Sequence, residues 1–143
     1  MHPDPVLAHD WLPVAAAQQI VPDQPLAARL LGEDLVLWRN GEQVLAWQDR
    51  CPHRGAQLSR GRVEPADGTL ICPYHGWRFA GSGDCVHLPA HPDQTPPARA
   101  AAVAYRVRAE YGLIWVSLGN PTTDLPLFIE WSDPSFRKVL CGP

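Results

Sequence analysis

Hydrophobic residues occur along this chain in short runs that turn-forming residues separate. Each of the runs at 26–31, 35–38 and 44–47 has the length of a β-strand. Asn40-Gly41 lies between the last two runs, and this dipeptide is a strong signal for a two-residue hairpin turn. The pattern predicts an antiparallel pair of strands that leads directly into residues 49–51.

Further segments fit the same fold class. Apolar and polar residues alternate over 103–108, as in a half-buried strand, and 113–117 is an apolar run suited to a covered strand. Residues 11–15 predict a short strand, although the three alanines at 15–17 also allow a helical turn. Sixteen prolines and eleven glycines favour many turns, so we expect an all-β protein.

The length of 143 residues suits one domain with a substantial buried core. We expect a single domain over 1–143, in which residues 1–9 form a loose lead-in and the proline-rich residues 87–99 lack regular structure. Residues 57–68 are polar and turn-like, which predicts a connection over the surface. The tryptophans on strand-like segments are expected in the core, namely Trp11, Trp38, Trp47, Trp115 and Trp131.

The overall charge argues against two classes of partner. A formal net charge of −3, with 19% charged residues, indicates no general attraction to nucleic acid or to an anionic membrane. The start of the chain shows no charged region followed by an apolar one, and no apolar run approaches the length of a membrane span. We therefore expect a cytoplasmic protein.

Residues 51–85 contain the side chains that suggest a chemistry. Cys51 and His53 form a Cys-x-His pair, and Cys72 and His75 form a Cys-x-x-His pair. Two thiolates and two imidazoles suit either one tetrahedral Zn²⁺ or a Rieske [2Fe–2S] centre, in which two His replace two Cys on one iron. Two facing loops of this kind can give both sulfurs to one iron and both nitrogens to the other, so the spacing favours the iron–sulfur centre.

The residues that flank the two pairs point the same way. A proline follows each cysteine, and it restricts the backbone of the loop. Gly55 and Gly76 follow the two histidines, where glycine allows a positive φ and can bring a backbone N–H close to an inorganic sulfide. Residues 69–71 predict a strand that leads into Cys72. Trp77 and Phe79 alternate as a strand that can wall the site from water.

The motifs CPHRGAQLSRG at 51–61 and CPYHGWRFAGSGDC at 72–85 resemble the Rieske domain of the large subunit of ring-hydroxylating and demethylating oxygenases. Weaker matches extend the resemblance over most of the chain: DWLPVA at 10–15, LLGEDLVLWRNG at 30–41 and YGLIWVSLG at 111–119. The resemblance implies a Rieske-type antiparallel β-sandwich with an inserted cluster-binding subdomain of two metal loops, here residues 49–86.

The resemblance also implies roles for single residues. Cys51 and Cys72 would bind the buried iron of a [2Fe–2S] cluster, and His53 and His75 would bind the outer iron. The neighbouring residues are expected to support the cluster without binding it: Arg54, Gly55, Tyr74, Gly76 and Trp77.

In the family that this chain resembles, a longer catalytic domain follows, with a mononuclear non-haem iron held by two His and a carboxylate. Residues 122–143 are expected to begin the connection to such a domain. We find no triad of this kind here and expect no catalytic residue in this chain. The other histidines are expected to be solvated or structural, namely His2, His9, His87 and His91.

The function that the resemblance implies is one-electron transfer as the input domain of such an oxygenase. The electron donor would be a ferredoxin or a flavin reductase domain. The acceptor would be a catalytic domain in a neighbouring subunit, which electrons would reach through His75 of this chain. A freestanding Rieske-type ferredoxin is the alternative, and a zinc-held interaction module is a third class. Five arginines lie near the loops in the sequence: Arg50, Arg54, Arg60, Arg62 and Arg78. They either steer an acidic electron donor or donate hydrogen bonds to loop carbonyls.

The chain departs from respiratory Rieske proteins at three positions. Those proteins carry an extra cysteine on each loop, joined as a disulfide, and a serine hydroxyl beside the second histidine loop. Ala56, Tyr74 and Trp77 stand at these positions here, so we expect a potential near the low end of the family range of roughly −150 to +300 mV. The sequence allows either a disulfide between the remaining Cys85 and Cys141 or two free thiols. Free thiols suit a reducing cytosol.

Overall fold

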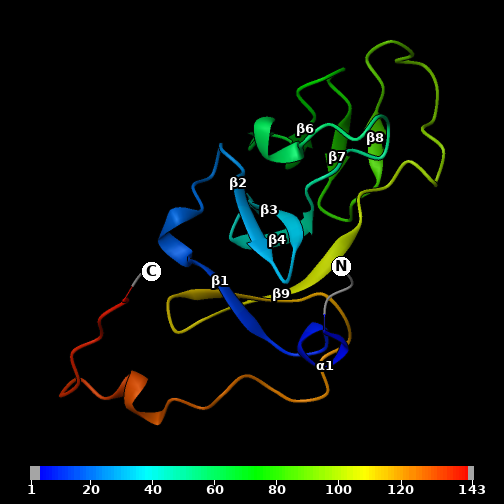
Figure 1. The fold of residues 1–143 in the computed structure, drawn as a ribbon. Helices are drawn as coiled ribbons and strands as arrows, with labels where there is room; N and C mark the ends of the chain where they lie inside the picture. The colour runs from blue at the N-terminus through cyan, green and yellow to red at the C-terminus, as the bar shows by residue number, and fades with distance from the viewer. Residues whose placement is uncertain (1–3, 142–143) are drawn as a thin grey trace.

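Two antiparallel sheets are stacked in the computed structural model, which describes residues 4–141 (Figure 1). The larger sheet has the order β1-β10-β9-β4-β3-β2, and the smaller sheet has the order β5-β6-β7-β8. The smaller sheet is inserted between β4 and β9. The prediction of an all-β antiparallel sandwich with an inserted subdomain is confirmed.

The bounds of the elements are as follows. The larger sheet consists of β1 (Leu12–Ala16), β2 (Leu26–Leu30), β3 (Glu33–Asn40), β4 (Gln43–Gln48), β9 (Ala104–Glu110) and β10 (Leu113–Ser117). The smaller sheet consists of β5 (Arg62–Glu64), β6 (Thr69–Ile71), β7 (Arg78–Ala80) and β8 (Cys85–His87). The short helical elements are α1 (Pro5–Ala8) and the 3-10 turns η1 (Ala17–Gln19), η2 (Leu58–Arg60) and η3 (Ile129–Ser132).

The hairpin β3–β4 forms as the Asn-Gly signal predicts. Asn40 pairs with Gln43 at the end of the ladder, and Gly41 in the turn has a φ of 60°. This backbone conformation is one that glycine adopts without steric cost. The predicted strand over 11–15 also forms, as β1, and the alanines that follow it make the 3-10 turn η1.

The hairpin is buried on both of its faces. Along β3, Leu35 and Leu37 belong to a core shared with β10, whereas Val36 and Trp38 belong to a core shared with the smaller sheet. Successive side chains of a strand point to opposite faces, so a continuous apolar run is required where both faces are covered. The run over 35–38 therefore supplies two cores at once.

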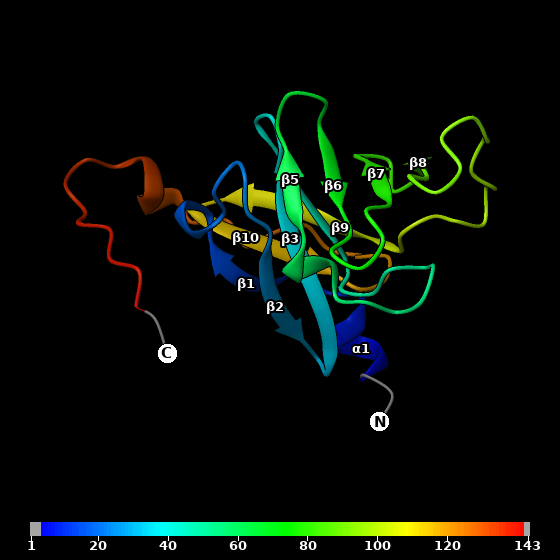
Figure 2. The same ribbon diagram turned by 90° about the horizontal axis from the view of Figure 1, so that it is seen from above.

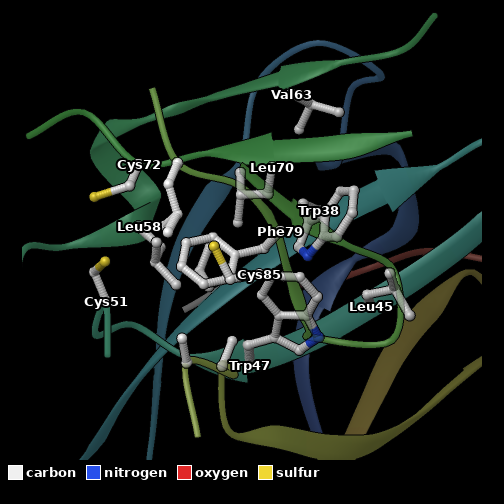
Figure 3. Close-up of a cluster of buried hydrophobic side chains, with 14 residues drawn as sticks. Trp38, Leu45, Trp47, Cys51, Leu58, Val63, Leu70, Cys72, Phe79 and Cys85 are labelled. Carbon is white, nitrogen blue, oxygen red and sulfur yellow. The ribbon is translucent and has the colours of Figure 1, made fainter. Parts of the chain in front are cut away.

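Aromatic rings join the hairpin to the smaller sheet (Figure 3). Trp47 packs edge-on against Trp38, with 4.9 Å between ring centroids, and against Phe79 of β7 at 6.5 Å. The Nε1 of Trp38 is buried and has no hydrogen-bond acceptor among residues 4–141. Figure 3 shows this nitrogen on the side that faces Trp47, where the face of an indole ring can receive a weak N–H···π contact.

The connection over residues 57–68 differs from the predicted surface loop. It contains η2 and β5, and both Leu58 and Val63 are buried in the core shared with the smaller sheet. These two apolar residues stand alone among polar neighbours, so no periodicity revealed them. The connection is thus part of the packing beneath the two Cys/His loops.

The two ends of the chain also differ from expectation. Residues 5–8 of the predicted loose start form α1, which the Asp4 side chain caps, and residues 1–3 lie outside the described residues. The segment after β10 runs on the opposite side of the domain from the smaller sheet in Figure 1, and its red part extends away from both sheets in the second view (Figure 2). It contains no strand among residues 118–141, and Trp131 is 37% exposed rather than in the core. Trp131 instead packs edge-on against Tyr111.

Most of the other expectations are confirmed. Of the residues 87–99 expected to lack regular structure, His87 ends β8, whereas 88–99 contain no helix or strand; 104–110 and 113–117 are strands. Trp38, Trp47 and Trp115 are buried as expected, whereas Trp11 is half-buried and lies outside both core clusters. No helix among residues 4–141 is long and apolar enough to cross a lipid bilayer.

Replacing Phe79 by alanine is expected to lower the free energy of unfolding by about 3–5 kcal/mol, because it leaves a cavity at the junction of the two sheets. Urea unfolding followed by far-UV circular dichroism measures this loss. Val86→Ala is the matched control, since Val86 lies on the neighbouring strand and is half exposed, and its effect should stay within about 0.5 kcal/mol. Equal losses in the two variants would contradict the proposed junction.

Candidate metal centre

The first Cys/His loop continues directly from β4. The N–H of Cys51 donates to the carbonyl of Ala56 at 2.8 Å, and the N–H of Gly55 donates to the carbonyl of Cys51 at 2.8 Å. Gly55 has a φ of 74°. These two bonds close a tight turn with Pro52 and His53 at its tip.

The second loop repeats this pattern after β6. The N–H of Cys72 donates to the carbonyl of Trp77 at 2.9 Å, and the N–H of Gly76 donates to the carbonyl of Cys72 at 3.2 Å. Gly76 has a φ of 70°. The positive φ predicted for both glycines is confirmed, but their N–H groups close the turns on the cysteine carbonyls. The expectation that these amides face an inorganic sulfide is therefore corrected.

Both cysteine side chains are directed into the protein. Cys51 is 2% exposed and Cys72 is 3% exposed, and Figure 3 shows them together at the edge of the core, near Leu58 and away from Trp38. Burial, reinforced by the neighbouring Cys72 thiol, raises the pKa of Cys51 to about 12. Such a thiol keeps its proton at neutral pH, and a bound metal ion would take the place of that proton.

The two histidine side chains lie on the outer side of the same loops. His53 is half-buried and His75 is exposed, and their ring centroids are 4.8 Å apart. Burial lowers the pKa of His53, and the nearby His75 and Arg54 lower it further by unfavourable charge interaction. A neutral imidazole with a free ring nitrogen is the form that binds a metal ion.

Aromatic rings hold both imidazoles in place. The Trp77 ring of the second loop stacks on the His53 ring of the first loop, with centroids 4.2 Å apart and an angle of 11° between planes. The Tyr74 ring lies against His75 at 3.9 Å. Trp77 also packs against the core shared with the smaller sheet, so this stack ties the first loop to the second.

The donor set fits a Rieske cluster in its chemistry and in its layout. Two sulfur donors lie inside and two nitrogen donors lie outside, each loop contributing one of each kind. A Rieske centre needs this division, because the cysteines bind one iron and the histidines bind the other. No group of three His, Cys, Asp or Glu side chains close enough to hold one ion occurs among residues 4–141.

Three contacts that support the loops were not predicted from the sequence. The buried Asp49 carboxylate accepts hydrogen bonds from the backbone and the hydroxyl of Ser59, which braces the first loop. The Arg50 guanidinium lies beside the α-carbon of Gly55, and Pro89 lies beside that of Gly76. The sequence places Asp49 between a strand and the first Cys/His pair. Its partner Ser59 lies at the far end of the loop, so the sequence did not reveal the contact.

The remaining residues singled out in the sequence lie away from the site or at its rim. Arg54 is exposed. His9 is structural, because its Nδ1 accepts the N–H of Asn120 at 2.9 Å, whereas His91 is exposed and His2 lies outside the described residues. Among the cysteines, all of which fall within residues 4–141, none forms a disulfide, and Cys85 is buried while Cys141 is exposed.

Comparisons with known proteins identify the family of the chain. The family model described as "Rieske [2Fe-2S] domain" matches residues 10–105. Methylxanthine N1-demethylase NdmA of Pseudomonas putida is 37% identical over 144 residues, which cover 96% of this chain and 40% of NdmA. The chain therefore spans well under half of this relative.

Solved structures give the same result. NdmB of Pseudomonas putida superposes with a TM-score of 0.86 at 37% identity, covering 93% of this chain and 42% of that one. Apo dicamba monooxygenase superposes with a TM-score of 0.80 at 35% identity, covering 92% and 41%. Because the family model spans well over half of its residues, this chain belongs to the Rieske [2Fe–2S] domain family, whose members hold a [2Fe–2S] cluster.

Proposed function

We propose that this domain passes single electrons to the iron site of an oxygenase, through a [2Fe–2S] cluster bound by Cys51, His53, Cys72 and His75. The observation that carries the proposal is the division of donors between two matching turns, with both sulfurs buried and both imidazoles outside. Similarity to NdmA, NdmB and dicamba monooxygenase supports the oxygenase as acceptor.

The bound cluster would supply one-electron chemistry, and the residues of this chain would hold and insulate it. The two cysteines would bind the inner iron as thiolates within the hydrophobic core, which excludes water from that side. The histidines would bind the outer iron, each through one ring nitrogen, and leave the other nitrogen facing outward. Trp77 would fix the plane of the His53 ring by stacking on it.

His75 is the proposed exit for electrons. It is more exposed than His53, which Trp77 covers on one face. Tyr74, at 60% exposure, lies against His75 and would take part in the same contact surface. A partner that docks on this tip would meet the imidazole directly, and the acceptor would be a catalytic domain in the same assembly.

Substitution of each proposed ligand is expected to abolish cluster binding. Cys51→Ala, Cys72→Ala, His53→Ala and His75→Ala should each lose acid-labile sulfide and the visible absorption of the cluster, because each iron loses one of its two protein ligands. Sulfide analysis and absorption spectroscopy of the whole natural protein measure this loss.

The chain offers matched controls for these variants. Cys85→Ala removes a buried cysteine of the same core, and His91→Ala removes an exposed histidine of the adjoining loop. Both are expected to keep the full sulfide content. A ligand variant that retains the cluster spectrum would remove that residue from the proposed set.

The midpoint potential is expected to lie below zero, towards the low end of the family range of roughly −150 to +300 mV. Hydrogen bonds to the cluster sulfurs raise the potential, and Trp77 offers no hydroxyl beside the second histidine loop. The N–H groups of Gly55 and Gly76 are already used by the turns. Redox titration followed by electron paramagnetic resonance measures the midpoint, and a value well above zero would contradict this reasoning.

Exposed arginines near the loops favour an acidic electron donor such as a ferredoxin or a flavin reductase domain. Arg50, Arg54, Arg60 and Arg62 are exposed, and none forms an ion pair within residues 4–141. Arg78 differs, because it donates to Asp67 at 2.8 Å and so has a structural partner. Four uncompensated guanidinium groups around one site would attract a negatively charged partner.

The rate of reduction by an acidic donor is expected to fall as ionic strength rises, since salt screens charges across the aqueous gap. The double variant R60E/R62E should be reduced about tenfold more slowly at low salt, with little difference at high salt. Stopped-flow kinetics measure these rates. Arg29→Glu, at an exposed position of the larger sheet, is the control, and a flat salt profile would end the steering hypothesis.

A further inference from the structure

One carboxylate is buried beside the first Cys/His loop, and the function proposed above does not use it. Asp49 is 6% exposed and lies two residues before Cys51. Its backbone N–H donates to the carbonyl of Asp34 at 2.9 Å, which fixes it to the start of β3. Acidic side chains are rarely buried to this degree unless a partner stabilises their charge.

The partner of this carboxylate is neutral. One Asp49 oxygen accepts the backbone N–H of Ser59 at 2.7 Å, and the other accepts the Ser59 hydroxyl at 2.6 Å. Ser59 follows Leu58, which belongs to the same buried cluster as Cys51 and Cys72. The carboxylate is therefore bonded to the residue next to Leu58, whose side chain packs in the same cluster as the buried cysteines.

The cations nearest in sequence do not neutralise Asp49. Arg50 and Asp49 line one surface depression, but the Arg50 guanidinium lies beside Gly55. Arg60 is exposed. Within residues 4–141, no ion pair involves Asp49. Its charge is stabilised by two hydrogen bonds and is not cancelled by an opposite charge.

We propose that the Asp49 carboxylate lowers the reduction potential of the bound cluster, with Ser59 partly shielding its charge. Reduction adds one electron and therefore one negative charge to the cluster. A fixed negative charge nearby makes that addition less favourable, and a buried charge is screened far less by water and salt than an exposed one. Asp49 is thus a tuning and positioning residue and binds no iron.

This inference rests on the proposed function, because it requires a cluster on the first loop. The two are tested separately by measuring iron and acid-labile sulfide before any potential. A natural protein without acid-labile sulfide would overturn the proposed function. A natural protein with a full cluster allows the role of Asp49 to be judged on the potential alone.

Asp49→Asn is expected to shift the midpoint of the cluster-loaded natural protein to a more positive value. Asparagine has the same shape and can still accept the Ser59 N–H, but it lacks the charge. The expected shift corresponds to about a tenfold change in the reduction equilibrium, or ~59 mV for one electron. The shift should persist at high salt, and an unchanged midpoint would overturn the inference.

Two further variants distinguish a charge effect from a general disturbance of the loop. Ser59→Ala keeps the carboxylate but removes the hydroxyl that shields it, so its midpoint should move in the opposite direction, to a more negative value. Asp34→Asn removes a carboxylate that is 59% exposed on the neighbouring strand, and its effect should be small and lost at high salt. Shifts of the same sign in the Asp49 and Ser59 variants, or an equal shift in the Asp34 variant, would contradict the proposal.

Discussion

The edge-on packing of Trp47 against Trp38 and Phe79 is the contact on which the rest of the structure depends. The four strands of the smaller sheet have three residues each, which is the lower limit of strand length in globular proteins. Their order comes from burial against the β3–β4 hairpin, whose other face is buried against β10. The two Cys/His loops are therefore fixed on a platform that is itself held from both sides.

That platform also explains why the two kinds of donor are separated. Cys51 follows the end of β4 and Cys72 follows the end of β6, so each cysteine still lies at the buried boundary where its strand ends. Each histidine lies beyond its cysteine, at the tip of a turn that the same two backbone hydrogen bonds close. Buried sulfur and accessible nitrogen thus follow from how far each residue lies beyond a buried strand.

The sequence was sufficient where the signal is local. Three signals depend only on residues that are neighbours in the sequence: the Asn-Gly turn, the continuous apolar run at 35–38 and the two Cys/His pairs. The hairpin and the close approach of the two pairs were predicted from these signals. The sequence was insufficient where the partner is distant. Leu58 is buried by residues from other strands, and the Asp49–Ser59 brace joins the two ends of a loop. Trp131 lies in an apolar stretch typical of a core, yet its main contact is the β9–β10 turn.

The position of each charge decides what it can do. The Gly55 and Gly76 amides donate within the turns, whereas the backbone amides of His53 and Arg54 lie within hydrogen-bonding reach of the Cys51 sulfur. Four arginines around the loops are exposed, and water and salt weaken their effect over a distance of ~10 Å: Arg50, Arg54, Arg60 and Arg62. Asp49 is 6% exposed, so water and salt screen its charge less than they screen the charges of the arginines. The proposed attraction of an acidic donor and the proposed lowering of the potential therefore depend on different residues, and neither role compromises the other.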